Sequence, residues 1–352
     1  MKTRINKFMV FFGVFWSVLT LLFDSFLFVS AVRQVRALTF PSAQGTMISS
    51  AVTSHDDSDG TTYGVAMRFQ YSVGDRAYEG KRFRYDTSTS SDSAWANAAV
   101  AERPPGTKVD VFYNPTNPED AVLVPGLLGS DLFQMAFLTP FNMVMFGLWA
   151  VGWAQVRRNW FKPLAGGVKI TTNLRQTRAR LTQFSALVSG LATLGLMSFL
   201  SIFVIGFFGG GFHPSLRTML LTWGVILAGS LTVGLWHGGW TLAGKYDLVI
   251  DELNGSVELP ATCGRKTRLR IPFGAVREVR VETIRQTSSD GEPSMPSHRL
   301  TLDVGGAQAG SERLVEWYDA QKAAEFAQWL REQLLRPTTS TRPLCGRISE
   351  SV

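Results

Sequence analysis

The chain has 352 residues, and only 18% of them are charged, which is below the roughly 25% usual for soluble globular proteins. Its apolar residues must therefore fill large cores or face lipid. The formal net charge is +7, but one short basic segment accounts for this excess, and no basic motif interleaved with aromatic residues accompanies it. The charge therefore does not indicate nucleic-acid binding.

The apolar residues are concentrated in four blocks. Each block is close to the roughly 20 residues that a helix needs to cross a hydrocarbon core. Only the first block carries a charge, Asp24. The blocks cover residues 8–32, 132–154, 184–208 and 218–242. We predict an α-helical membrane protein with four transmembrane helices. They lie in segments 1–32, 131–155, 184–208 and 218–243.

The first block has some features of a secretory signal peptide. Lys2, Arg4 and Lys7 precede it, and a small-residue "VSA" lies near its end. The apolar core of a signal peptide, however, is about 7 to 15 residues long, and this block is longer. We expect it to be retained as a membrane anchor.

A basic loop sets the expected orientation. Segment 156–183 contains no acidic residue and carries the basic residues Arg157, Arg158, Lys162, Lys169, Arg175, Arg178 and Arg180. Such short basic loops stay in the cytoplasm. We therefore expect both termini inside a bacterial cytoplasmic (inner) membrane, with 33–130 and the short loop 209–217 outside. Cys263 and Cys345 then lie in the reducing cytoplasm, where neither a disulfide nor a zinc site is expected.

The outer segment 33–130 has the pattern of a β-rich α+β domain. Alternating residues predict strands on both sides of Gly74-Asp75, which is a hairpin signal. A short helix is expected over 91–102. Val109, Val111 and Tyr113 then share one strand face, and "NPTNP" predicts a rigid turn before the short strand "AVLV".

The order of these motifs resembles a known family. "FPSAQGTMISS", "YGVAMRFQYSVGDRAYEGKRF", a short Ala-rich helix and "PPGTKVDVFYNPTNPEDAVL" follow one another between membrane helices. This order is similar to the bacterial domain-of-unknown-function family numbered 3592, over about residues 36–153. The resemblance implies a small extracytoplasmic β domain between membrane helices. It implies no activity and supplies no site residues.

The segment 244–336 is expected to form a cytoplasmic β-rich domain that ends in one helix. Asn254-Gly255 predicts a hairpin, and 267–284 and 298–304 add strands. A helix beginning near Asp319 places Ala323, Phe326, Ala327, Leu330 and Leu334 on one stripe. The order resembles the pleckstrin-homology-like domains at the cytoplasmic ends of bacterial membrane proteins. The polar tail 337–352 is expected to be disordered.

No motif predicts catalytic, cofactor-binding or metal-binding residues. The acidic segment 54–60 fails as an EF-hand loop, because the alignment puts His55 first and Ala66 last. Metalloprotease, nucleophile-elbow, phosphate-loop and paired-cysteine motifs are absent from the sequence. The histidines His55, His213, His237 and His298 are scattered. We therefore expect no enzymatic activity and no cofactor.

Two features of the apolar blocks leave alternatives open. Asp24 lies at membrane depth, where a charge costs about 2.5 to 3.5 kcal/mol on insertion scales; it is protonated, reaches polar partners or water, or belongs to an ion pathway. Ser230, Gly234 and Gly238 bring helix backbones close, either within the four-helix set or between copies.

The basic residues Arg265, Lys266, Arg268 and Arg270 follow the last block closely. They either bind anionic lipid, at about 1 kcal/mol each, or only solvate the exposed face of a strand.

Three functions are compatible with the sequence. The first is a non-enzymatic envelope interaction, scaffold or sensing protein, with the lipid bilayer and unknown membrane or envelope proteins as partners. The second is an accessory subunit of a transporter or channel, and the third is a membrane enzyme.

Overall fold

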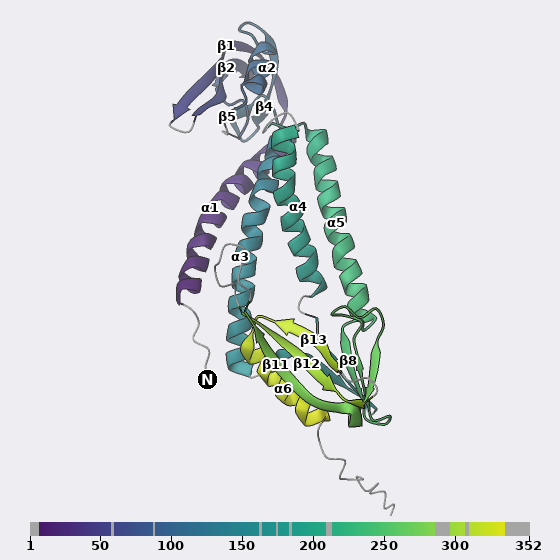
Figure 1. Ribbon diagram of the computed structural model, residues 1–352. Helices are drawn as coiled ribbons and strands as arrows, with labels where there is room; N and C mark the ends of the chain where they lie inside the picture. Colours follow the sequence, from purple (N-terminus) through teal and green to yellow (C-terminus); the bar gives the residue numbers. More distant parts are fainter. Residues whose placement is uncertain are drawn as a thin grey trace, which may run out of the picture. The chain divides into compact units, whose positions relative to one another are not determined.

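The computed structural model describes residues 7–57, 60–86, 89–161, 164–173, 175–182, 185–208, 213–285, 296–306 and 310–334. The chain divides into two compact units. One combines 3–155 with 186–235, and the other combines 156–185 with 236–352. Each unit contains its own β-sheet domain (Figure 1).

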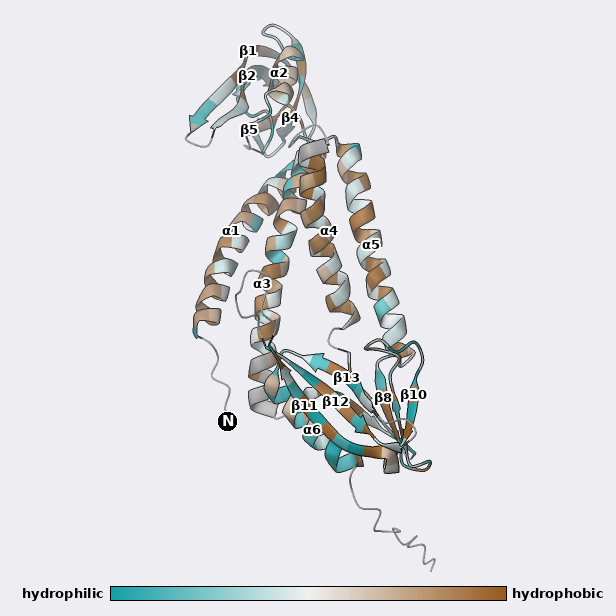
Figure 2. Ribbon diagram, in the orientation of Figure 1, coloured by the Kyte–Doolittle hydropathy of each residue, from teal (hydrophilic) through white to brown (hydrophobic). Residues whose placement is uncertain are grey.

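Four helices are long and apolar enough to cross a membrane: α1 (Lys7–Ala37), α3 (Gly129–Phe161), α4 (Ala186–Phe208) and α5 (Leu216–Leu242). The described residues of each predicted apolar block lie in or directly beside one of them. Large apolar side chains such as Phe11, Leu22, Leu220 and Leu235 remain exposed along their surfaces, and hydrophobic residues run the length of each helix (Figure 2). Such surfaces are stable only against lipid. The chain is a membrane protein with β-sheet domains.

The described helices contact one another through small and polar groups. The indole nitrogen of Trp16 in α1 donates to the carbonyl oxygen of Phe141 in α3 at 3.1 Å. Between α4 and α5, a Cβ added at Gly234 would lie 3.6 Å from the Cα of Gly190. The small residues therefore pack helices within the chain, which is the first of the two interpretations left open by the sequence.

The first unit contains a five-stranded antiparallel sheet in the order β3-β2-β1-β4-β5. Its elements are β1 (Ser42–Asp57), β2 (Gly60–Val73), β3 (Arg76–Gly80), α2 (Ala94–Ala101), β4 (Lys108–Asn114) and β5 (Asn117–Val122). In β2 the buried Met67, Phe69 and Tyr71 alternate with exposed residues. The predicted hairpin at Gly74-Asp75 is confirmed, with Gly74 at φ +59°.

Hydrogen bonds connect the two ends of this sheet. The hydroxyl of Tyr71 in β2 donates to the carbonyl oxygen of Pro118 in β5. The backbone N–H groups of Leu123 and Val124 both donate to the carbonyl oxygen of Phe83, just after β3. These bonds reduce the number of unpaired edge groups that the small domain exposes.

Three strands extend further than the sequence pattern predicts. β1 reaches Asp57 and β2 begins at Gly60, so most of the expected acidic loop is strand; Asp59 lies outside the described residues. β5 begins at Asn117 rather than at "AVLV". It accommodates Pro118 because it is the edge strand, where a missing N–H is tolerated.

The second unit has a five-stranded sheet in the order β10-β9-β8-β7-β6 and a three-stranded sheet, β11-β12-β13. The strands are β6 (Lys169–Thr172), β7 (Gln176–Arg180), β8 (Asp247–Asp251), β9 (Ser256–Leu259), β10 (Leu269–Pro272), β11 (Val276–Ile284), β12 (Ser297–Val304) and β13 (Gly310–Trp317). Short 3-10 helices cover Leu164–Gly167 and Phe273–Ala275. The hairpin at Asn254-Gly255 is present between β8 and β9.

The basic segment 156–183, predicted to be a loop, is largely structured. α3 continues to Phe161, and β6 and β7 join the sheet. The alternation in β7 explains this: Ala179 is fully buried opposite Leu248 of β8, while Arg178 is exposed. The arginines of β7 made the segment resemble a basic loop, although the other face of this strand is buried.

Helix α6 (Ala320–Leu334) packs against this second β domain. Its buried residues include Ala323, Phe326, Ala327, Leu330 and Leu334. The guanidinium of Arg331 donates to the carbonyl oxygen of Val279 in β11, with its nearer nitrogen at 2.7 Å. The predicted disordered tail lies outside the described residues.

A candidate binding cavity beside the membrane helices

A cavity of about 600 Å³ lies where the first β domain meets the ends of the membrane helices. Its walls come from β1, β2, the segment after β3, α2, β5, the start of α3 and His213 between α4 and α5. This cavity is within the size range of small-molecule sites. Two other cavities in the same unit have smaller volumes of about 530 and 210 Å³.

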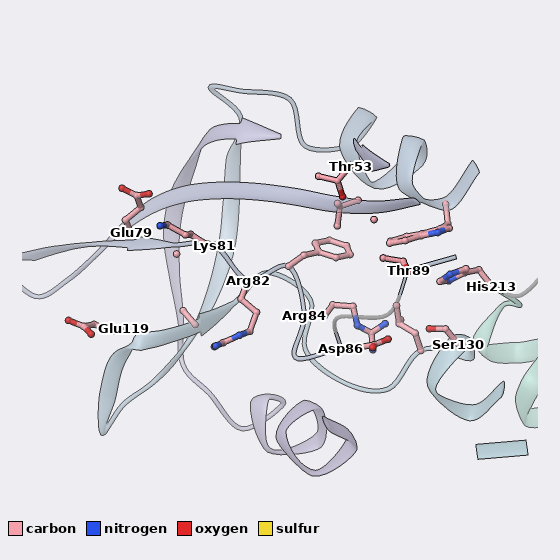
Figure 3. A pocket seen from close by; sticks show the side chains of 17 residues that line it. Thr53, Glu79, Lys81, Arg82, Arg84, Asp86, Thr89, Glu119, Ser130 and His213 are labelled. Atoms are coloured by element: carbon pink, nitrogen blue, oxygen red, sulfur yellow. The ribbon is translucent and has the colours of Figure 1, made fainter. Parts of the chain in front are cut away.

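The polar side chains of the cavity form two groups (Figure 3). Arg84, Asp86, Thr89, Ser130 and His213 gather at one end, and Glu79, Lys81, Arg82 and Glu119 lie at the other. Both ends contain acids and bases. The cavity is therefore suited to a polar ligand that both donates and accepts hydrogen bonds.

A buried ion pair joins the β domain to α3 at one end of the cavity. Nη2 of Arg84 lies 2.5 Å from Oδ2 of Asp131, and only 6% and 8% of the two side chains are exposed. Asp131 also accepts a hydrogen bond from the backbone N–H of Leu128 at 2.6 Å. It lies in the first turn of α3, where a negative charge is favourable. Breaking such a pair typically costs about 3–5 kcal/mol, because one charge is left buried and unpaired.

The same arginine also reaches α1. The side chain of Gln34 is fully buried. With its amide oxygen turned toward Arg84, it accepts from Nε at 2.8 Å and from Nη2 at 3.0 Å. Nη2 also lies 3.4 Å from the carbonyl oxygen of Gly126. One side chain of the β domain is thus bound to two membrane helices.

His213 brings the connection between α4 and α5 to the cavity. Its ring stacks on Trp95 of α2, with the ring centroids 4.6 Å apart and an interplanar angle of 19°. Burial lowers the pKa of His213 below its ordinary value, against the opposing effect of Asp92 and Asp86. The imidazole is therefore neutral at neutral pH.

Two further contacts describe the cavity wall around His213 and Trp95. A Cβ added at Gly129 would overlap the carbonyl oxygen of Pro214, so the α4–α5 connection touches the start of α3. The indole nitrogen of Trp95 is buried and has no hydrogen-bond partner among the described residues. An unpaired buried donor costs about 1–3 kcal/mol, so an acceptor from a ligand or a water would stabilise this wall.

Asp24 has a polar partner inside the helix set. The side-chain nitrogen of Asn142 in α3 donates to Oδ1 of Asp24 at 3.0 Å. This contact supports the interpretation in which Asp24 reaches a polar group. It also fastens α1 to α3, beside a second contact in which the indole of Trp149 donates to the hydroxyl of Ser17 at 2.8 Å.

Most of the basic strand residues of the second domain are paired. Arg265 lies 2.9 Å from Glu312, while Arg268 (3.4 Å) and Arg270 (2.6 Å) share Glu258. Lys266 is exposed. The two glutamates offset part of the positive charge, so the three arginines are less available to anionic lipid than their sequence indicates.

The four histidines do not come together. His55 lies in β1 opposite Thr62, the ring of His237 lies tilted against that of Tyr246 with the centroids 5.4 Å apart, and His298 lies 3.2 Å from the hydroxyl of Thr283. No group of three His, Cys, Asp or Glu residues that could hold a metal occurs in the described ranges. Sequence reasoning missed the cavity, Arg84, Asp131 and His213. The one available signal was a histidine in a short loop between apolar blocks, since loops often carry binding residues.

Comparison with known families identifies the first β domain. Residues 43–128 match the family model described as "Domain of unknown function (DUF3592)". This segment is a DUF3592 domain. The predicted resemblance to this family is thereby confirmed over residues 43–128, whereas the resemblance of 244–336 to pleckstrin-homology-like domains stays a prediction. The DUF3592 match includes Arg84 and Trp95 but not Asp131 or His213, so the cavity combines family and non-family residues. No curated protein and no solved structure matches the chain.

Proposed function

We propose that the protein is a non-enzymatic sensing or scaffold protein of the bacterial cytoplasmic membrane. Its DUF3592 domain lies outside and binds an envelope partner or ligand at the cavity, and its second β domain, with a pleckstrin-homology-like order of elements, lies inside. The basic segment 156–183 and the basic N-terminus support this orientation.

The buried Arg84–Asp131 pair is the observation that carries the proposal. A flexible anchor needs no buried charges, whereas this contact holds the DUF3592 domain to α3 in one geometry. Leaving one of these charges buried without its partner typically costs about 3–5 kcal/mol, so the paired and the separated arrangement differ clearly in free energy. A ligand that favours one of the two arrangements therefore shifts the population of helix positions.

The lining of the cavity supplies the coupling. A molecule in the cavity touches the DUF3592 domain, Ser130 at the start of α3 and His213 between α4 and α5. Only differential contacts can shift a conformational equilibrium, and this cavity offers contacts from the DUF3592 domain, the start of α3 and the α4–α5 connection. No contact among the described residues favours the transporter or enzyme alternatives in the same way.

Co-purification from mild detergent tests the proposal. The full-length protein, Trp95→Ala and the control Asp75→Ala would each be isolated, and the bound proteins and small molecules identified by mass spectrometry. Asp75 is exposed in the β2–β3 turn, away from the cavity lining. We expect a bound species that is kept by the control and lost from Trp95→Ala. No bound species on the wild type, or the same set on all three proteins, contradicts the proposal.

A further inference from the structure

A second cavity, of about 530 Å³, lies against the end of α1 in the same unit. Its polar walls include Arg33 and Arg36 of α1, Arg82 and Tyr85 of the segment after β3, and Glu119 and Asp120 of β5. It shares Arg82 and Glu119 with the first cavity, but its other lining residues are different.

The length of α1 places this cavity at the membrane surface. The helix has 31 residues and is about 46 Å long at 1.5 Å per residue, whereas the hydrocarbon core is about 30 Å thick. Its apolar block ends at Val32. Arg33 and Arg36 are therefore the first basic residues beyond the hydrocarbon, at the level of the phospholipid headgroups.

The charges inside the cavity leave two arginines without a carboxylate. Arg82 lies 2.6 Å from Asp120, and Tyr85 also hydrogen-bonds Asp120, with burial and that carboxylate raising the pKa of Tyr85 to about 12. Arg33 and Arg36 are exposed and make no ion pair with any residue in the described ranges. One turn apart, they present two guanidinium groups on the same side of α1.

We propose that this cavity binds the phosphodiester of a phospholipid headgroup between Arg33 and Arg36. Guanidinium groups form paired, charge-assisted hydrogen bonds with phosphate oxygens. Glu119, which also lines the cavity, would receive the ammonium of an ethanolamine headgroup. The lipid would fill the space between α1 and the DUF3592 domain on the leaflet that faces the domain, in addition to any ligand of the first cavity.

Native mass spectrometry of the full-length protein tests this lipid site. The protein would be stripped of loosely bound lipid in detergent and titrated with phosphatidylethanolamine. The comparison is between wild type, the double variant Arg33→Gln with Arg36→Gln, and the control Arg217→Gln, which alters another exposed arginine near a helix end. We expect one retained lipid per chain, at least tenfold weaker in the double variant and unchanged in the control. Equal binding by all three proteins overturns the proposal.

Two further arms separate a lipid from a soluble phosphate and from a folding defect. Millimolar glycerophosphoethanolamine should not displace the lipid; if it does so at a concentration similar to that of the lipid itself, the site belongs to a soluble phosphate compound. A photoreactive residue in place of Asn117, which lines the cavity, should crosslink to phospholipid in native membranes. The same residue in place of Asp75 should not. Equal crosslinking at both positions also overturns the proposal.

Discussion

Arg84 is the residue on which the junction between the DUF3592 domain and the helices most depends. Replacing it by Gln leaves Asp131 buried and unpaired, so we expect the domain to lose about 3–5 kcal/mol of stability. Pulse proteolysis of the full-length protein in urea measures this loss. The double variant Arg84→Met with Asp131→Leu should recover part of it, because no lone charge remains. A double variant as unstable as the sum of both single variants would show that the pair is not coupled.

His213 makes the same junction sensitive to pH. Burial lowers the pKa of its imidazole in the folded protein below the ordinary value of 6.5, and Asp86, Asp92 and Asp131 oppose this while Arg84 reinforces it. The unfolded chain therefore binds the proton more readily, and the stabilising contribution is complete above pH 6.5 and declines as the pH falls below it. Thermal midpoints in detergent should fall more between pH 7.5 and 5.5 for wild type than for His213→Phe. Parallel profiles for the two proteins would contradict this assignment.

At the scale of residues, the sequence predicted which side chains are buried better than it predicted which side chains pair with one another. The burial of Val109 and Val111 follows from strand alternation. Arg84 looked like one more charge in a polar loop, because its partners Gln34 and Asp131 are about 50 residues away on either side. Only the fold brings them together, so no local pattern could have predicted the pair.

Among the helices, Gly234 lies where the backbone of α5 approaches the backbone of α4. A Cβ there would lie 3.4 Å from the carbonyl oxygen of Ala186 and 3.6 Å from the Cα of Gly190, whereas nothing lies within 4 Å of a Cβ at Gly224. Gly234→Leu should therefore separate α4 from α5 and lower the thermal midpoint in detergent, while Gly224→Leu should change it little. Equal midpoints would mean that the glycine contact contributes nothing to packing.

Substitutions in β7 test whether segment 156–183 is folded or is only a basic loop. Ala179→Glu puts a charge at a fully buried position, and Arg178→Gln changes an exposed one. A charge there without a partner costs several kcal/mol, so we expect Ala179→Glu to make the second β domain sensitive to protease and Arg178→Gln to leave it resistant. If 156–183 were only a loop, both variants would be equally resistant.

At the scale of elements, apolar blocks and hairpin signals predicted the helices and most strands. The strands in 156–183 were not predicted from the sequence, and the reason is physical. These strands are short, and they become stable only by pairing with β8, which lies more than 60 residues later in the chain.

For the whole molecule, orientation is the prediction most easily tested. Cys263 is an exposed free thiol in the second β domain, and Asp75→Cys places another in the exposed turn of the DUF3592 domain. A membrane-impermeant maleimide should label residue 75 in intact cells and Cys263 only after the membrane is opened. Labelling of Cys263 in intact cells would reverse the proposed topology.

The central claim is that the cavity couples the DUF3592 domain to the membrane helices. Hydrogen exchange of the full-length protein in lipid nanodiscs, compared between wild type and Trp95→Ala, tests it most directly. Loss of the stacking on His213 should increase exchange at the start of α3 and at the start of α5, beyond the mutated helix α2, while β8 and β9 keep their protection. A change confined to α2 and the neighbouring strands β1 and β2 would contradict the account.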